Sequence, residues 1–216
     1  MKRFSLFLMF VLSVFPLLAQ KIDTDVKVQE VYQACIAMRD AASAKDTAAI
    51  NQSAKLLAAC QTKEFAALRS KQEQESLDGH LVFDEEFAKQ LAEGKDAYQQ
   101  SDSICDTIAE RGQTANGSIL TKTCFAKAGK SVKYTFPSKN KQILAVVAEA
   151  GGRVTMKVHV TNKKGLNKRY DDTTSVKLGL PNRKTTFMLP GDCVNTVELE
   201  VVNCSKKDIS FVVISN

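Results

Sequence analysis

A histidine and a short acidic run are the residues of this chain best suited to acid–base or metal chemistry. His80 precedes Asp84, Glu85 and Glu86 in the stretch HLVFDEEF. A shared site would need His80 and Asp84 on one helix face, but Gly79 and the capping preference of aspartate favour a helix that begins at Asp84. Glutamates in the first turn of a helix complement its dipole. We therefore interpret the run as a helix N-terminus.

The stretch Ala-Gly-Lys-Ser at 128–131 matches the end of a phosphate-binding loop. Such a loop needs a first glycine and a helix after the Ser, so that backbone N–H groups face the phosphates. Cys124 stands at the first glycine position, and Val132, Tyr134 and Phe136 then alternate with polar residues, which is typical of a strand. The stretch therefore predicts a turn between two strands.

No other motif predicts catalysis or metal binding. His159 falls on the outward phase of a strand, where we expect a surface histidine. Asp171 and Asp172 have only Asp192 as a further local carboxylate, which is too few for a calcium site. The sequence thus predicts no catalytic residue, no cofactor and no metal, and a protein that is not an enzyme. A hydrolase or enzyme-accessory protein with an unseen site is the alternative.

The N-terminus has the pattern of a signal peptide. Lys2 and Arg3 precede an apolar stretch over 4–18, and Leu-Leu-Ala at 17–19 suits cleavage before Gln20. We expect 1–19 to be removed and the chain to be periplasmic, outer-membrane-associated or extracellular. No later stretch is apolar enough for a transmembrane segment in the mature chain.

Six cysteines in an exported chain predict disulfides. They are Cys35, Cys60, Cys105, Cys124, Cys193 and Cys204. The closest two are eleven positions apart, so zinc is not indicated. We expect Cys35 to pair with Cys60 across the first helical turn. A strand of about 30 Å would hold Cys193 and Cys204 apart, so we expect one of them to meet Cys124.

The periodicity of the apolar residues changes along the chain and predicts two segregated domains, an α+β arrangement. Over 20–112 the spacing is three and four, and caps at Asp46 and Asp84 favour an antiparallel helical bundle whose second helix extends through Phe65 and Leu68. From 119 to 216 the period is two and Gly/Pro turns recur, which predicts an all-β sandwich of jelly-roll type. We expect residues 113–118 to form the hinge between them.

The β segment resembles pre-peptidase C-terminal-like modules of secreted bacterial proteins. The stretches VKYTF, ILAVVAEAGGRVTMKVHV, FMLPGDCVNTVELEVVN and ISFVVIS carry this resemblance. It implies a non-catalytic accessory module. The stretch NKKGLNKRYDD is basic where that family has an acidic strand, so no calcium site is implied.

Charge divides at the same boundary. Residues 20–118 contain 11 Lys and Arg against 17 Asp and Glu, whereas 119–216 contain 17 against 7. Such an excess indicates an acidic partner. The chain has no Trp, which disfavours sugar stacking, and an exported protein seldom meets nucleic acid. We therefore predict an exported binding or adhesion-type protein of the bacterial envelope. Its partner is a polyanionic glycan, an envelope component or another envelope protein. A purely structural envelope protein, with the sandwich docked on its own acidic helices, is the further alternative.

The residues predicted to bind the anion share a position on outward strand phases or in turns. They are Lys133, Lys157, His159, Lys163, Lys164, Lys168, Arg169, Lys177, Arg183 and Lys184.

Overall fold

The computed structural model describes residues 25–70, 77, 79–94, 118–171 and 179–216. The predicted signal peptide at 1–19, most of the predicted hinge, Cys105 and Lys177 lie outside the described residues.

Three helices lie in the N-terminal part of the described chain. The first covers residues 25–44, and α2 (Thr47–Cys60) and α3 (Glu85–Ala92) follow. Asp46 caps α2 by accepting the Ala49 N–H at 3.0 Å, and Asp84 caps α3 by accepting the Phe87 N–H at 2.7 Å. Both predicted helix starts are confirmed. None of the described helices is long and apolar enough to cross a membrane.

The second helix ends earlier than predicted. Gln61 takes a left-handed conformation (φ 48°, ψ 49°) and stops α2 at Cys60, so the expected continuation through Phe65 and Leu68 is wrong. The segment after Gln61 forms two short strands, β1 (Lys63–Glu64) and β2 (Arg69–Ser70), and each joins a different sheet. Phe65 and Leu68 lie between them and are buried in the core.

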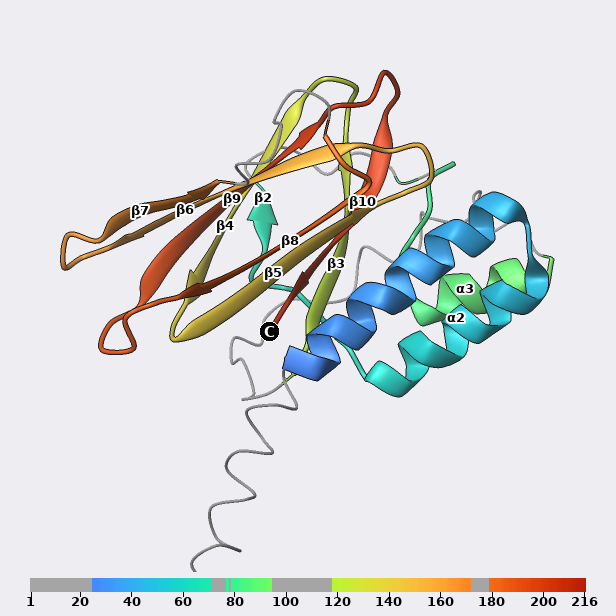
Figure 1. The fold of residues 1–216 in the computed structure, drawn as a ribbon, viewed down its shortest axis with the longest axis horizontal. Helices are drawn as coiled ribbons and strands as arrows, with labels where there is room; N and C mark the ends of the chain where they lie inside the picture. Colours follow the sequence, from blue (N-terminus) through green and yellow to red (C-terminus); the bar gives the residue numbers. More distant parts are fainter. Residues whose placement is uncertain (1–24, 71–76, 78, 95–117, 172–178) are drawn as a thin grey trace, which may run out of the picture.

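Eight longer strands form the rest of the fold. They are β3 (Leu120–Ala126), β4 (Ser131–Ser138), β5 (Lys141–Ala148), β6 (Val154–Asn162), β7 (Asn167–Asp171), β8 (Asn182–Met188), β9 (Asn195–Asn203) and β10 (Ile209–Ser215). Sheet A has the order β1-β3-β10-β5-β8, and sheet B has the order β2-β4-β9-β6-β7. Figure 1 shows the two sheets packed face to face.

The strand pairs are nested about the turn between β6 and β7. β6 pairs with β7, β5 with β8, β4 with β9 and β3 with β10, all antiparallel. The segment from β3 to β10 is therefore one long hairpin wound into two sheets, which is the arrangement of a jelly roll. Residues 127–130, with the Lys130 N–H bonded to the Lys127 carbonyl at 3.0 Å, form the β3–β4 turn predicted in place of a phosphate loop.

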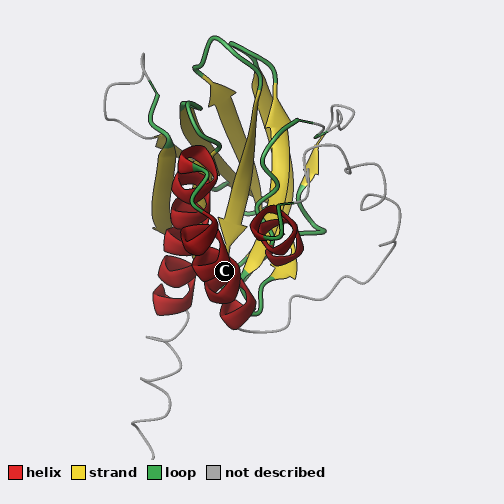
Figure 2. Cartoon of the chain, turned by 90° about the vertical axis from the view of Figure 1, so that its right-hand side faces the viewer, coloured by secondary structure: helices red, strands yellow, loops and turns green. Residues whose placement is uncertain are grey.

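Two apolar cores hold the layers together. The first lies between the sheets and includes Tyr134, Phe136 and Phe211. The second lies between sheet A and the helices, where Val31 and Met38 share a cluster with β-strand residues such as Ile214. Figure 2 shows the helices in front of the sheets.

Two strands of sheet A, β5 and β10, are consequently buried on both faces. In β5 and β10 every residue but Lys141 is buried, whereas β9 alternates between buried and more exposed positions. The described helices use a sheet to complete their core, so a self-contained helical bundle is not confirmed. Independent folding of 20–112 and 119–216 stays a prediction.

Candidate functional site

The cations predicted to bind an anion fall in three separate places. The first is the outer face of sheet B, where Lys133 lies 3.8 Å from Glu198 and Lys157 lies 3.5 Å from Glu200. His159 is bonded to Asn167 at 2.8 Å and is paired in register with Glu198 and Arg169. Two glutamates in the central strand thus offset much of the positive charge of this face.

The second place is the β6–β7 hairpin. Lys164 contacts Asp192, and this pair raises the pKa of the lysine and lowers that of the carboxyl. Lys168 lies over the Tyr170 ring, 5.2 Å from its centroid, and Lys163 is exposed in the turn. This hairpin is basic, but part of its charge is already paired.

The third place is β8, beside the helices. Arg183 is buried, and its Nε donates to the Val154 carbonyl at 3.5 Å. Lys184 donates to Gln29 of the first helix and lies 6.0 Å from the Tyr32 ring centroid. Arg183 therefore cannot serve as a surface anion site, and Lys184 attaches the helix to the sheet. Lys177 lies outside the described residues.

The structure instead gathers exposed cations at one end of the sandwich, where three loops meet. We call this the basic end, and define it by Lys127, Lys130, Arg153, Lys206 and Lys207, all of which are exposed. We did not predict this unit, because its residues come from three turns that are distant in the chain.

Backbone and side-chain hydrogen bonds join the three loops. The Asn203 N–H donates to the Lys130 carbonyl at 2.9 Å, and the Ala128 N–H donates to Asp208 at the same distance. The Cys204 N–H donates to the Arg153 carbonyl at 2.7 Å. The turns that carry the cations are therefore fixed to one another.

A pocket of about 500 Å³ opens beside the basic end. Its lining comes from the first helix, from the segment before α3, and from the β5–β6 and β9–β10 loops. The charged or titratable residues in it are Arg39, His80, Glu149, Lys207 and Asp208.

Glu149 is the most connected side chain of the pocket. Its carboxylate lies 3.1 Å from His80 Nδ1 and 3.7 Å from Lys207 Nζ, and it accepts the Leu81 N–H and the Ser210 hydroxyl, both at 3.2 Å. Lys207 also donates to the Ala150 carbonyl at 2.9 Å. These contacts fasten the segment before α3 to the end of β5.

This arrangement positions charge but does not make a nucleophile. Ser210 is fully buried and donates to the Leu81 carbonyl at 2.6 Å, so its hydroxyl cannot reach a substrate. His80 contacts Glu149, and Asp84 caps α3, as its capping preference predicted. Among the described residues no group of His, Cys, Asp and Glu could hold a metal ion.

Arg39 and Glu149 were not expected in a site. Arg39 donates to Asp40 at 2.8 Å and to Asn182 of β8 at 3.4 Å, with only 11% of its side chain exposed. A signal for Glu149 exists in the sequence, since it is a lone carboxylate at the end of the apolar run ILAVVA before Gly-Gly. A carboxylate in such a place needs donors from elsewhere in the fold.

All five described cysteines are free thiols. Neither expected disulfide is present: Cys35 is not linked to Cys60, and Cys124 is not linked to Cys193 or Cys204. Cys124 is buried beside Tyr134, and burial raises its pKa to about 12. Cys193 accepts from Asn162 Nδ2 at 3.2 Å, and β9 separates it from Cys204, as predicted.

No family model and no curated protein matches this chain. Solved structures resemble part of it. The Yersinia pseudotuberculosis-derived mitogen is 10% identical over 46% of this chain and 85% of its own, with a TM-score of 0.34. PliG of Salmonella Typhimurium, a periplasmic inhibitor of g-type lysozyme, is 16% identical over 50% and 93%, with a TM-score of 0.30. At these scores neither likeness carries an argument about function.

Proposed function

We propose that this chain is an exported, non-catalytic binding protein that takes an acidic polymer or an acidic surface at the basic end of its jelly roll. The observation that carries the proposal is the convergence of three hydrogen-bonded turns that present Lys130, Arg153 and Lys206 beside a charged pocket. Export rests on the pattern of residues 1–19.

The charges of the basic end are suited to an external anion. Among the described residues, no ion pair joins Lys130, Arg153 or Lys206 to a carboxylate. Asp208 accepts the Ala128 N–H, and Glu149 accepts the Leu81 N–H and lies 3.7 Å from Lys207, so neither acid is paired with these three cations. An incoming polyanion would therefore meet the three cations without displacing an internal partner.

The outer face of sheet B suits an anion less well. Glu198 and Glu200 lie in its central strand between Lys133 and Lys157, and the register also brings Lys157 opposite Glu200. An anion on this face would be repelled by two carboxylates. This contrast is the reason for placing the site at the end of the sandwich.

Anionic envelope glycans are the ligand class that this chemistry favours. The chain has no Trp for stacking on neutral sugars, so sulfate, phosphate or carboxylate groups must supply the contacts. Such binding weakens with salt, because the Debye length shortens to about 8 Å near physiological ionic strength. The resemblance of 119–216 to pre-peptidase C-terminal-like modules stays a prediction.

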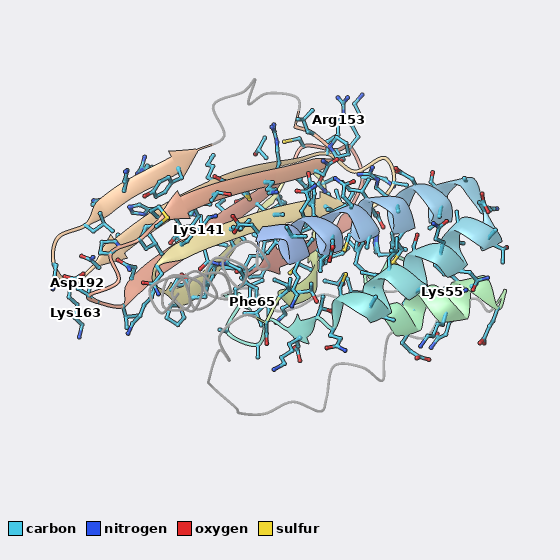
Figure 3. The ribbon with its side chains drawn as sticks, turned by 60° about the horizontal axis from the view of Figure 1, so that its bottom comes forward. Lys55, Phe65, Lys141, Arg153, Lys163 and Asp192 are labelled. Atoms are coloured by element: carbon cyan, nitrogen blue, oxygen red, sulfur yellow. The ribbon has the colours of Figure 1, made fainter. Side chains whose placement is uncertain are left out.

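The test compares two triple variants with the same change of charge. Lys130→Glu/Arg153→Glu/Lys206→Glu alters the basic end. Lys139→Glu/Lys163→Glu/Arg169→Glu alters exposed cations at or near the opposite end, which the length of β9 places roughly 26 Å away. Figure 3 shows Arg153 and Lys163 far apart in this way.

Binding is measured by salt elution from immobilised heparin and by titration with soluble heparin at low salt. Three lost contacts at about 0.5 kcal/mol each weaken binding about tenfold, and charge reversal adds to this. We expect that loss in the first variant and less than threefold change in the second. Equal losses in both, or no retention of the unaltered chain at low salt, would refute the proposal. Circular dichroism controls for folding.

A further inference from the structure

A second feature, independent of the basic end, lies in the hairpin of the first helix and α2. The Lys45 N–H donates to the Ala42 carbonyl at 3.2 Å and the Asp46 N–H to the Ala41 carbonyl at 3.1 Å, so the two helices are joined by a tight connection. Cys35 lies in the first helix, and Cys60 is the last residue of α2. Both thiols belong to the core between the helices and sheet A.

Cys35 and Cys60 lie at slightly different axial distances from the connection between the two helices. Cys35 lies about ten residues before the connection and Cys60 about fourteen after it, which at about 1.5 Å per residue gives an axial offset of about 6 Å. Helical side chains lean toward the N-terminus of their own helix. In this antiparallel pair the two side chains therefore lean toward each other along the helix axes, which reduces the axial offset between the sulfurs.

The electrostatic environment of the thiols agrees with this placement. Burial is the main cause that raises the pKa of Cys35, and the charge of Cys60 raises it further. Burial also raises the pKa of Cys60, with Glu30 as the second cause. Glu30 precedes Cys35 in the first helix, at the side to which the Cys35 side chain leans, and its effect on the pKa of Cys60 is consistent with the axial offset.

The two thiols differ in exposure. Cys35 is fully buried, whereas Cys60 is partly exposed. Cys60 is also followed directly by Gln61, whose left-handed conformation ends the helix. The last helical turn is the part of a helix that opens at least cost. Cys60 can thus meet a reagent and shift toward Cys35.

We propose that Cys35 and Cys60 form a disulfide by exchange with a disulfide-bearing oxidant, in which Cys60 reacts first and Cys35 resolves. The Cys60 thiolate attacks one sulfur of the oxidant, the oxidant's S–S bond breaks, and the released sulfur takes up a proton as a thiol. The Cys35 thiol then gives up its proton and attacks the Cys60 sulfur, which releases the second thiol. Two cysteines lose two protons and two electrons, and the oxidant gains both.

The test uses the full chain, reduced and then incubated with oxidised glutathione at pH 8. Trypsin separates the two cysteines, because Arg39, Lys45 and Lys55 lie between them. We expect non-reducing peptide mapping to recover a Cys35–Cys60 link, and Tm to rise relative to the reduced chain. A Cys204→Ser variant serves as the matched control and should keep the link.

Single variants resolve the order of the steps. In Cys35→Ser, glutathione should remain attached to Cys60, because the resolving thiol is missing. In Cys60→Ser, Cys35 should stay free of glutathione while the chain is folded. Thiols that both remain free, a link from Cys60 to another cysteine such as Cys105, or a glutathione adduct on Cys35 would each overturn the proposal.

Discussion

Replacing Glu149 by alanine removes an acceptor that four groups share. The carboxylate accepts the Leu81 N–H and the Ser210 hydroxyl, and His80 and Lys207 lie within 3.1 and 3.7 Å of it. Only 10% of the Glu149 side chain is exposed. Ser210 retains the Leu81 carbonyl and Lys207 retains the Ala150 carbonyl, so the buried Leu81 N–H and the 19% exposed His80 ring are the groups that lose their partner.

The expected loss follows from these contacts. A buried N–H left without an acceptor costs about 2 kcal/mol, and the lost contacts to His80 and Lys207 add about 1 kcal/mol because Lys207 is largely exposed. We therefore expect Glu149→Ala to lower the free energy of unfolding by about 3 kcal/mol. Glu149→Gln keeps an oxygen acceptor for Leu81 but loses the charge, so about 1 kcal/mol is expected.

Urea unfolding followed by circular dichroism measures these differences. Glu198→Ala is the matched control, because its side chain is 41% exposed and lies 3.8 Å from Lys133, and an exposed pair of this kind contributes about 0.5 kcal/mol. The reasoning is refuted if Glu149→Ala costs no more than Glu198→Ala. It is also refuted if Glu149→Gln is as harmful as Glu149→Ala, since the loss would then come from charge alone.

Two further predictions concern the cores. A fragment of residues 119–216 exposes the face of sheet A that carries Ile143, Val147 and Ile214, so it should bind a hydrophobic dye and unfold at lower urea than the full chain; equal midpoints would show that the helices add nothing. Burial raises the pKa of Cys124 from 9.0 to about 12, so the folded chain holds this proton more tightly than the unfolded chain. The resulting stability, of order 4 kcal/mol, is complete below pH 9 and is lost between about pH 9 and 12. The urea midpoint should therefore fall more steeply with pH in the unaltered chain than in Cys124→Ala, and parallel curves would contradict the assignment.

Strands whose residues alternate between buried and exposed, such as β9, could be predicted from the sequence. For strands buried on both faces, such as β5, the strand could be predicted but not the layer that covers its second face. Val197, Leu199 and Val201 of β9 point into the core as their period of two predicts. The unbroken apolar runs at 143–148 and 211–214 contained the signal that a second layer covers sheet A. Alternation of apolar and polar residues predicts only one buried face per strand. We therefore predicted that the helices form a core of their own, whereas they cover the second face of sheet A.

The end of α2 and the charged pocket could not be predicted for different reasons. Glutamine seldom takes the left-handed conformation that Gln61 has here. Nothing in the local sequence therefore predicts the end of a helix whose apolar spacing continues to Phe65. The contact of His80 with Glu149 joins positions far apart in the chain, and it depends on how the helices sit on sheet A. Gly and Pro residues predict where the turns lie in the sequence. Which turns lie next to one another depends on the order of the strands in the two sheets.

The nested pairing of the jelly roll determines the order in which its strand pairs can form during folding. Loop-closure entropy favours the local pair β6–β7 first, and each pair further out closes a longer loop. The last strand, β10, is also the one that lies between β3 and β5 in sheet A. A polypeptide that stops short of Ile209 would leave β3 and β5 without their shared neighbour and both cores open. The final seven residues of the sheet therefore decide whether a nascent chain can reach a protease-resistant state.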